Sequence, residues 1–130
     1  MKSRNKNARV LHVTVGETLG EAGARAAAAM KAIDAGRPVK PYFGAGFSEI
    51  GLMLAVFTPK RWELIAALRE AGPASVAELA RRLQRHYKNV HADVKLLIEW
   101  MAIERGEDGR VRVPWSEIVV DMKLPDQIAA

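Results

Sequence analysis

The stretch "SVAELARRLQRHYKNVHADVKLL", residues 75–97, predicts two consecutive amphipathic helices joined by a tight turn. Ser75 and Glu78 have the spacing of a capping box, which opens the first of the two helices. The apolar residues of that helix recur at helical intervals and are expected to point inward: Val76, Leu79, Ala80 and Leu83.

The second helix is expected over residues 86–101, with one apolar face. Val90, Val94, Leu97 and Met101 fall at successive helical turns and define that face. The same stretch is strongly basic, because residues 81–95 contain one acid, Asp93, and five cations: Arg81, Arg82, Arg85, Lys88 and Lys95. This local excess of four positive charges is most of the net charge of +5 of the chain. We therefore expect this helix to lie against a polyanion while its apolar face holds it on the core.

The neighbouring sequence extends this pair of helices into a larger unit. Thr58 and Pro59 are typical of a helix start, and Gly72-Pro73 ends the helix that follows. After the basic helix, "IERGEDGRVRV" at residues 103–113 predicts two short strands with a turn around residues 107–109. Three helices followed by a hairpin describe a winged helix-turn-helix over residues 58–114.

The flanking segments predict further elements on both sides of this unit. Alternation over residues 9–15 predicts a strand, and residues 18–35 predict a helix that ends before Gly36. The segment "PVKPYFGAGFSEI" at residues 38–50 indicates an irregular or edge strand, after which Ser48 is expected to cap a short helix through Phe57. Residues 116–124 predict a last strand, which we expect to pair with residues 9–15 either within one chain or between two chains.

The predicted class is therefore α+β, mainly α, in three parts. Residues 1–57 form a strand-helix extension for dimerisation or partner binding, residues 58–114 the winged helix-turn-helix, and residues 115–130 a strand and tail. Residues 1–8 are polar and expected to be loosely held. The predicted helix of the extension has a face of small and apolar residues that suits a helix–helix contact: Leu19, Ala22, Ala26, Ala29 and Ile33. The alternative is that alanine simply favours a helix there.

Three motifs carry a family resemblance: "TPKR" at residues 58–61, "YKNVHADV" at 87–94 and "IVVD" at 118–121. With them, residues 58–114 resemble the MarR-like winged-helix proteins of bacteria and archaea. More narrowly, they are similar to a group of small DNA-binding regulators, some of them encoded as antitoxin-like partners of toxins. The chain departs from that pattern in three places, which are Gln84 in the turn, Trp100-Met101-Ala102 at the helix end, and the acidic pair Glu107 and Asp108 at the wing tip. The last departure argues against deep insertion of the wing into a minor groove.

The resemblance implies a DNA-contacting set on the basic helix and its turn. Lys88, Asn89, Ala92 and Lys95 face away from the apolar side, and asparagine can pair with adenine while lysine reaches guanine. Arg85, His86 and Tyr87 are expected near phosphates, and His91 on the helix surface or facing phosphate. The alternative is a solvated basic face on a winged helix that binds protein.

A second set of cations is expected to contact the DNA backbone: Lys60, Arg61, Arg81, Arg105, Arg110 and Arg112. The wing arginines have an alternative, which is pairing with Glu104, Glu107 and Asp108 in water. For Lys60 and Arg61, the alternative is an accidental position on the surface at a helix start.

Several functional classes find no support in the sequence. The chain has no cysteine, which excludes disulfides and thiolate metal sites, and its three histidines do not share a helix face at ligand spacing. There is no nucleophile with a base and no glycine-rich phosphate loop, so we expect neither an enzyme nor a cofactor. No run is long enough to span a bilayer and the basic start is not followed by a signal-peptide core, so a cytoplasmic protein is expected.

Two functions remain as hypotheses. The first is a sequence-specific regulator that binds double-stranded DNA as a homodimer and acts as a repressor by occluding a promoter. The second is an antitoxin-like interaction module whose residues 9–57 bind and neutralise a toxin, with or without DNA binding.

Overall fold

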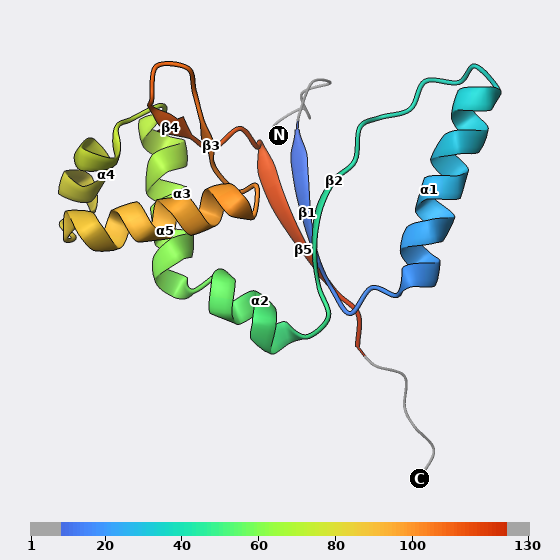
Figure 1. Ribbon diagram of the computed structural model, residues 1–130, viewed down its shortest axis with the longest axis horizontal. Helices are drawn as coiled ribbons and strands as arrows, with labels where there is room; N and C mark the ends of the chain where they lie inside the picture. Colours follow the sequence, from blue (N-terminus) through green and yellow to red (C-terminus); the bar gives the residue numbers. More distant parts are fainter. Residues whose placement is uncertain (1–8, 125–130) are drawn as a thin grey trace, which may run out of the picture.

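The computed structural model describes residues 9–124 and joins a three-stranded sheet to a group of short helices and a small hairpin (Figure 1). In chain order the elements are β1 Val10–Val15, α1 Leu19–Asp34, β2 Phe43–Phe47, α2 Ile50–Val56, α3 Pro59–Ala71, α4 Val76–Leu83, α5 Tyr87–Glu99, β3 Glu104–Arg105, β4 Val111–Arg112 and β5 Glu117–Met122. The predicted α+β class is confirmed. The prediction for residues 1–8 and for the end of the C-terminal tail, residues 125–130, lies outside the described residues.

The sheet has the order β2-β1-β5, and both pairings are parallel. β1 is central, with Leu11 and Val13 fully buried, while β2 is an edge strand as predicted. Leu11 pairs with Ile118, so the two predicted valine-rich strands meet within one chain. Two strands that are more than a hundred residues apart in the sequence are thus neighbours in the sheet, and all the helices come between them in chain order.

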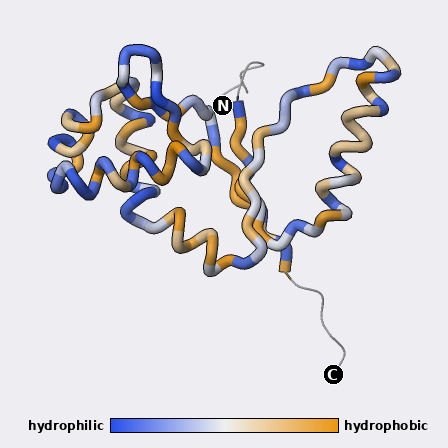
Figure 2. Tube along the Cα trace, in the orientation of Figure 1, coloured by the Kyte–Doolittle hydropathy of each residue, from blue (hydrophilic) through white to orange (hydrophobic). Residues whose placement is uncertain are grey.

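The inner face of the sheet, which we define as the face toward α2–α5, carries the core. Leu11, Val13 and Val15 project from β1 into one apolar cluster with residues of α3, α4 and α5. Phe47 of β2 stacks on Trp100, with ring centroids 4.3 Å apart, and also packs edge-on against the fully buried Phe57. Figure 2 shows hydrophobic residues along β1, β5 and α2, whereas the tip between β3 and β4 is hydrophilic.

Three helices and a hairpin follow each other as predicted from residue 58 onward. Thr58 caps α3, since its Oγ1 accepts a hydrogen bond from the Arg61 N–H at 3.3 Å, and Ser75 caps α4 by accepting from the Glu78 N–H at 3.1 Å. β3 and β4 pair antiparallel, and Ala74 adds a bridge to Val111 before α4 begins. The hairpin is therefore tied to the start of α4 as well as to the end of α5.

α4 and α5 end in the same way, although neither has glycine at its end. Gln84 and Met101 adopt left-handed conformations, with φ of 53° and 67°. The N–H of Arg85 donates to the Ala80 carbonyl and that of Ala102 to the Leu97 carbonyl, which is the bond of a Schellman motif.

Two smaller predictions were wrong. Met101 does not continue the inward face of α5, because α5 ends at Glu99 and the Met101 side chain is exposed. Ser48 does not cap α2, because the capping position falls on Glu49 and no side chain makes the bond. Sequence spacing extended both helices by a residue or more, which is the usual uncertainty at helix ends.

α1 lies apart from the rest of the chain, on the side of the sheet opposite α2–α5 (Figure 1). None of its residues is buried, and Leu19, at 93% exposure, is almost fully in solvent. Arg25 of α1 pairs with Glu17, and its guanidinium carbon lies 4.1 Å from the centre of the Tyr42 ring. A parallel sheet ordinarily has both faces covered, and here α1 leaves the outer face without a packed helix.

Candidate nucleic-acid interface

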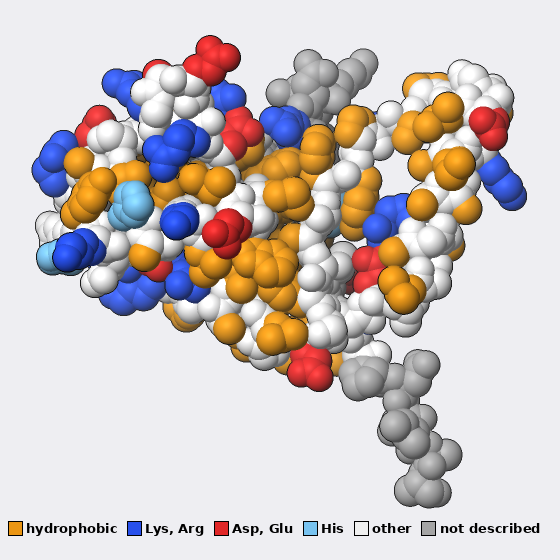
Figure 3. Space-filling view, viewed as in Figure 1, with side chains coloured by type: hydrophobic (Ala, Val, Ile, Leu, Met, Phe, Trp, Pro, Cys, Tyr) orange, Lys and Arg blue, Asp and Glu red, His pale blue; other side chains and the backbone are white. Residues whose placement is uncertain are grey.

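The outward face of α5 is polar and accessible. Val90, Val94 and Leu97 are fully buried, which confirms the predicted inward face. On the opposite side the residues expected to contact DNA are all exposed: Lys88, Asn89, His91, Ala92 and Lys95. Figure 3 shows Lys, Arg and His side chains gathered over the part of the molecule that contains α4 and α5.

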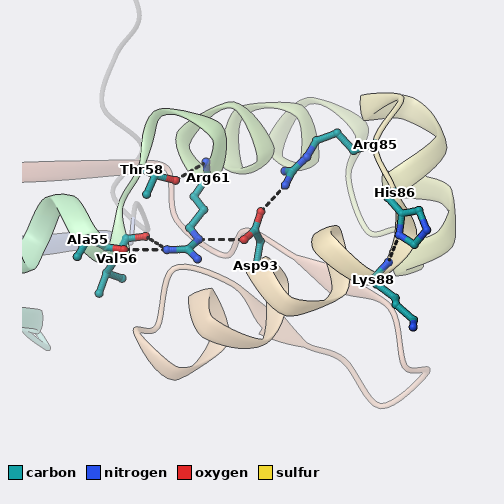
Figure 4. A network of polar contacts seen from close by, with 8 residues as sticks. All are labelled: Ala55, Val56, Thr58, Arg61, Arg85, His86, Lys88 and Asp93. Carbon is teal, nitrogen blue, oxygen red and sulfur yellow. Dashed lines mark hydrogen bonds and ion pairs between the residues drawn. The ribbon is translucent and has the colours of Figure 1, made fainter.

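The turn before α5 presents the beginning of that helix. His86 occupies the N-cap position, and its Nδ1 accepts a hydrogen bond from the Lys88 N–H at 3.3 Å (Figure 4). Tyr87 is half exposed and its ring lies 5.8 Å from that of His91. Both rings therefore lie side by side at the first turn of α5.

A carboxylate on the inner side of α5 holds the helix against its neighbours. Asp93 is only 9% exposed, and its two oxygens accept from two arginines, Oδ1 from Arg61 Nε at 3.0 Å and Oδ2 from Arg85 Nη2 at 2.7 Å (Figure 4). Nη1 of Arg61 also donates to the carbonyls of Ala55 and Val56, each at 2.9 Å. One carboxylate thus connects the end of α2, the start of α3, the turn and α5.

This network changes the roles of two predicted site residues. Arg61 and Arg85 were expected near phosphate, but both guanidinium groups point inward to Asp93 and their side chains are about four-fifths buried. They remain two cations around one acid, so the network still contributes one positive charge beneath α5. Arg85 Nη1 is buried and has no hydrogen-bond partner within residues 9–124.

Asp93 is the residue that sequence reasoning missed. It was counted only as the one acid among five cations. Its position carried a usable signal, because residue 93 lies between 90, 94 and 97 on the inward side of a helix. A charged residue at such a position requires a partner of opposite charge, and Arg61 and Arg85 supply it.

Most of the exposed basic residues of α4 and α5 make no ion pair within the described residues. Lys88, Lys95 and Arg81 make no ion pair within the described residues, and Arg82 lies at a loose 3.7 Å from the exposed Glu70. On α5 the acid other than Asp93 is Glu99, at the far end of the helix. A positive field therefore remains over the first turns of α5.

The three arginines of the hairpin, Arg105, Arg110 and Arg112, differ in their contacts. Arg112 is paired with Glu104, Nε to Oε1 at 2.7 Å, as the alternative interpretation predicted. Arg105 Nη1 donates to the Gly109 carbonyl at 3.0 Å, and Asp108 accepts from the backbone N–H of Arg110. Within the described residues, the Arg110 side chain makes no ion pair or hydrogen bond, and it is exposed like Lys60 on α3.

Other kinds of site receive no support from the part of the chain described. No cluster of three acidic or histidine side chains that would suit a metal ion occurs within residues 9–124. In the same range no helix has the length and apolar character needed to cross a bilayer.

Comparison with known proteins places this part of the chain in a family. A family model described as HVO_A0114 matches residues 56–120, half of the chain. The chain belongs to the HVO_A0114 family. The matched residues run from the end of α2 through α3, α4, α5 and the hairpin into β5, whereas β1, α1 and β2 lie outside them. No curated protein and no solved structure matches the chain.

Proposed function

We propose that this HVO_A0114-family protein is a sequence-specific, double-stranded DNA-binding regulator with a MarR-like winged helix-turn-helix. In this proposal α5 enters the major groove, α4 and the hairpin lie over the backbone, and the protein acts as a dimeric repressor. The observation that carries the proposal is the exposed face of α5, on which Lys88, Asn89 and Lys95 lie together, whereas the acid of this face, Glu99, comes only at the last residue of the helix.

The chemistry of this face suits base recognition. Asn89 has a carboxamide that can bond adenine at two atoms, and Lys88 can donate to guanine acceptors. Ala92 leaves a small apolar surface between Lys88 and Lys95, where a thymine methyl group would fit. Side chains of these types at the start of a helix are the ones that a major-groove contact requires.

Rigid support beneath the helix favours the same function. The Asp93 network ties α5 to α3 and to the turn, so the exposed side chains start from a fixed backbone. Base contacts depend on side chains held within fractions of an ångström of their positions. A basic face that served only for solubility would not need such support.

The wing supplies a first prediction. Replacing Arg110 with alanine is expected to remove one phosphate contact per copy and to lower the slope of log affinity against log salt by about one for each copy. Arg112→Ala is the matched control, because that guanidinium is already engaged by Glu104 and the slope is expected to change little. Fluorescence anisotropy with a bound duplex across salt concentrations measures both slopes. Equal slopes for wild type and Arg110→Ala would remove the wing from the interface.

A second candidate function is an antitoxin-like interaction module, and α1 is the observation that favours it. The helix buries none of its residues, yet Leu19, Met30 and Ile33 are apolar and exposed. Exposed apolar side chains on an isolated helix suit a groove on another protein.

One substitution separates the two candidates. Ala26→Glu, on the same helix, is expected to abolish capture of a protein partner and to leave DNA affinity within about twofold, because α1 is remote from α5. Pull-down and anisotropy on the same preparation measure the two effects. Loss of DNA affinity in Ala26→Glu would contradict this division of roles.

A further inference from the structure

β5 forms an edge of the sheet, and its second side pairs with no strand among residues 9–124. Three apolar side chains of this strand are accessible: Val119 is 37% exposed, Val120 42% and Met122 40%. An unpaired edge with exposed apolar side chains is a template for pairing with another strand. The acids Glu117 and Asp121 give the edge a charge pattern that selects its partner.

We propose that a second copy of this chain occupies that edge, with the two β5 strands antiparallel and Val120 on the two-fold axis. The two sheets then become one sheet of six strands with both sets of helices on its inner face. An isologous contact of this type is the commonest way for identical chains to pair. The proposal supplies the dimer that the proposed function requires, but its test uses no DNA, so failure of either can be recognised separately.

The backbone of β5 offers the right groups in the right places. The Lys123 N–H donates to the Val15 carbonyl at 2.8 Å. Because successive residues of a strand direct their backbone groups to opposite sides, odd-numbered residues of β5 point toward β1. Ile118, Val120 and Met122 therefore direct their N–H and C=O groups to the free edge. With Val120 on the axis, Val120 faces Val120 of the second copy and Ile118 faces Met122 of the second copy. The residues of each pair then exchange backbone hydrogen bonds.

The side chains match in the same register. Ile118 faces Met122 of the second copy on the inner face, and the two Val120 side chains face each other. On the outer face Glu117 lies opposite Lys123 of the second copy, and symmetry repeats this pair of opposite charges. A shift by two residues would instead place Glu117 opposite Asp121, where like charges repel.

An apolar groove beside β5 agrees with this register. It has a volume of about 220 Å³ and lies between α3 and the start of the strand, lined by Trp62, Ile65, Ala66, Val113, Trp115 and Ile118, among others. Met122 of the second copy, opposite Ile118, would lie at this groove. Pairing would then cover the exposed Met122 side chain and fill the apolar groove.

The test is sedimentation equilibrium of the full chain without DNA, using charge exchange across the strands. Glu117→Lys and Lys123→Glu are each expected to weaken dimerisation about tenfold, since two symmetric pairs change from attraction to repulsion. The variant carrying both changes restores opposite charges and is expected to return to within about threefold of wild type. Both residues are exposed, so the restored dimer also shows that the fold is intact.

Two further variants complete the test. Val120→Glu places two carboxylates at the axis and is expected to give a monomer, at least about a hundredfold weaker in association. Ala26→Glu on α1 is the control and is expected to remain a dimer. A monomeric wild type, single charge changes without effect, or loss of the dimer in Ala26→Glu alone would each overturn the proposal.

Discussion

Asp93→Ala is expected to lower the free energy of unfolding by about 3 kcal/mol. Removal of the carboxylate leaves the guanidinium groups of Arg61 and Arg85 close together, mostly buried and without their partner. The two cations then repel each other across the junction of α3 with α5. Urea unfolding followed by circular dichroism measures the loss.

Two control variants define the cause. Asp93→Asn keeps an oxygen that can accept one hydrogen bond and is expected to lose less, about 1 to 2 kcal/mol. Asp108→Ala removes an exposed acid at the hairpin and is expected to change stability by less than about 0.5 kcal/mol. If Asp93→Ala were as stable as wild type, the network would not hold α5 in place.

The combined change Lys88→Ala and Asn89→Ala is expected to weaken binding to a specific duplex about a hundredfold or more. In the proposed complex each copy would lose an adenine contact and a cation near guanine or phosphate, worth about 1 to 3 kcal/mol per good base contact. Both side chains are exposed, so the free energy of unfolding is expected to change little. Fluorescence anisotropy at a fixed salt concentration measures the affinity.

Lys31→Ala is the matched control, because Lys31 is a basic residue of the remote helix α1. It is expected to leave the affinity within about twofold. If the Lys88→Ala and Asn89→Ala protein bound its duplex as tightly as wild type, α5 would not be the recognition helix. The antitoxin-like function would then become the better account of the exposed surfaces.

Local signals predicted the elements from residue 58 onward. Thr58 and Ser75 start helices because their side chains accept from backbone groups three residues later, and that effect depends only on nearby residues. The inward face of α5 followed from the spacing of Val90, Val94 and Leu97 for the same reason. Exposure of Lys88 and Asn89 is the other side of that pattern.

Other features depended on contacts between distant residues. The partners of Asp93 are Arg61 of α3 and Arg85 of the turn. The helical periodicity of α5 alone does not predict which residues these are. Pairing of the last strand with residues 9–15 was predicted, but the order β2-β1-β5 and the parallel direction of both pairings were not, because the strands carry no local signal for them. Periodicity likewise predicted α1 correctly but not that it would lie apart, because packing depends on the surface offered to the helix.

The left-handed residues show a third kind of limit. Gln84 and Met101 take conformations in which glycine is favoured, because the chain must turn there to place α5 and the hairpin. Tertiary packing determines these turns against local preference. The same reasoning explains why sequence alone placed Met101 on the wrong face.

The most direct test of the central claim is capture of genomic DNA fragments by the purified protein at low and at moderate salt, followed by sequencing. The account predicts that a few fragments survive moderate salt, share an inverted repeat and are lost by the Lys88→Ala and Asn89→Ala protein. Uniform capture that disappears with salt, equally in both proteins, would contradict it and leave the basic face of α5 as an electrostatic surface without sequence recognition.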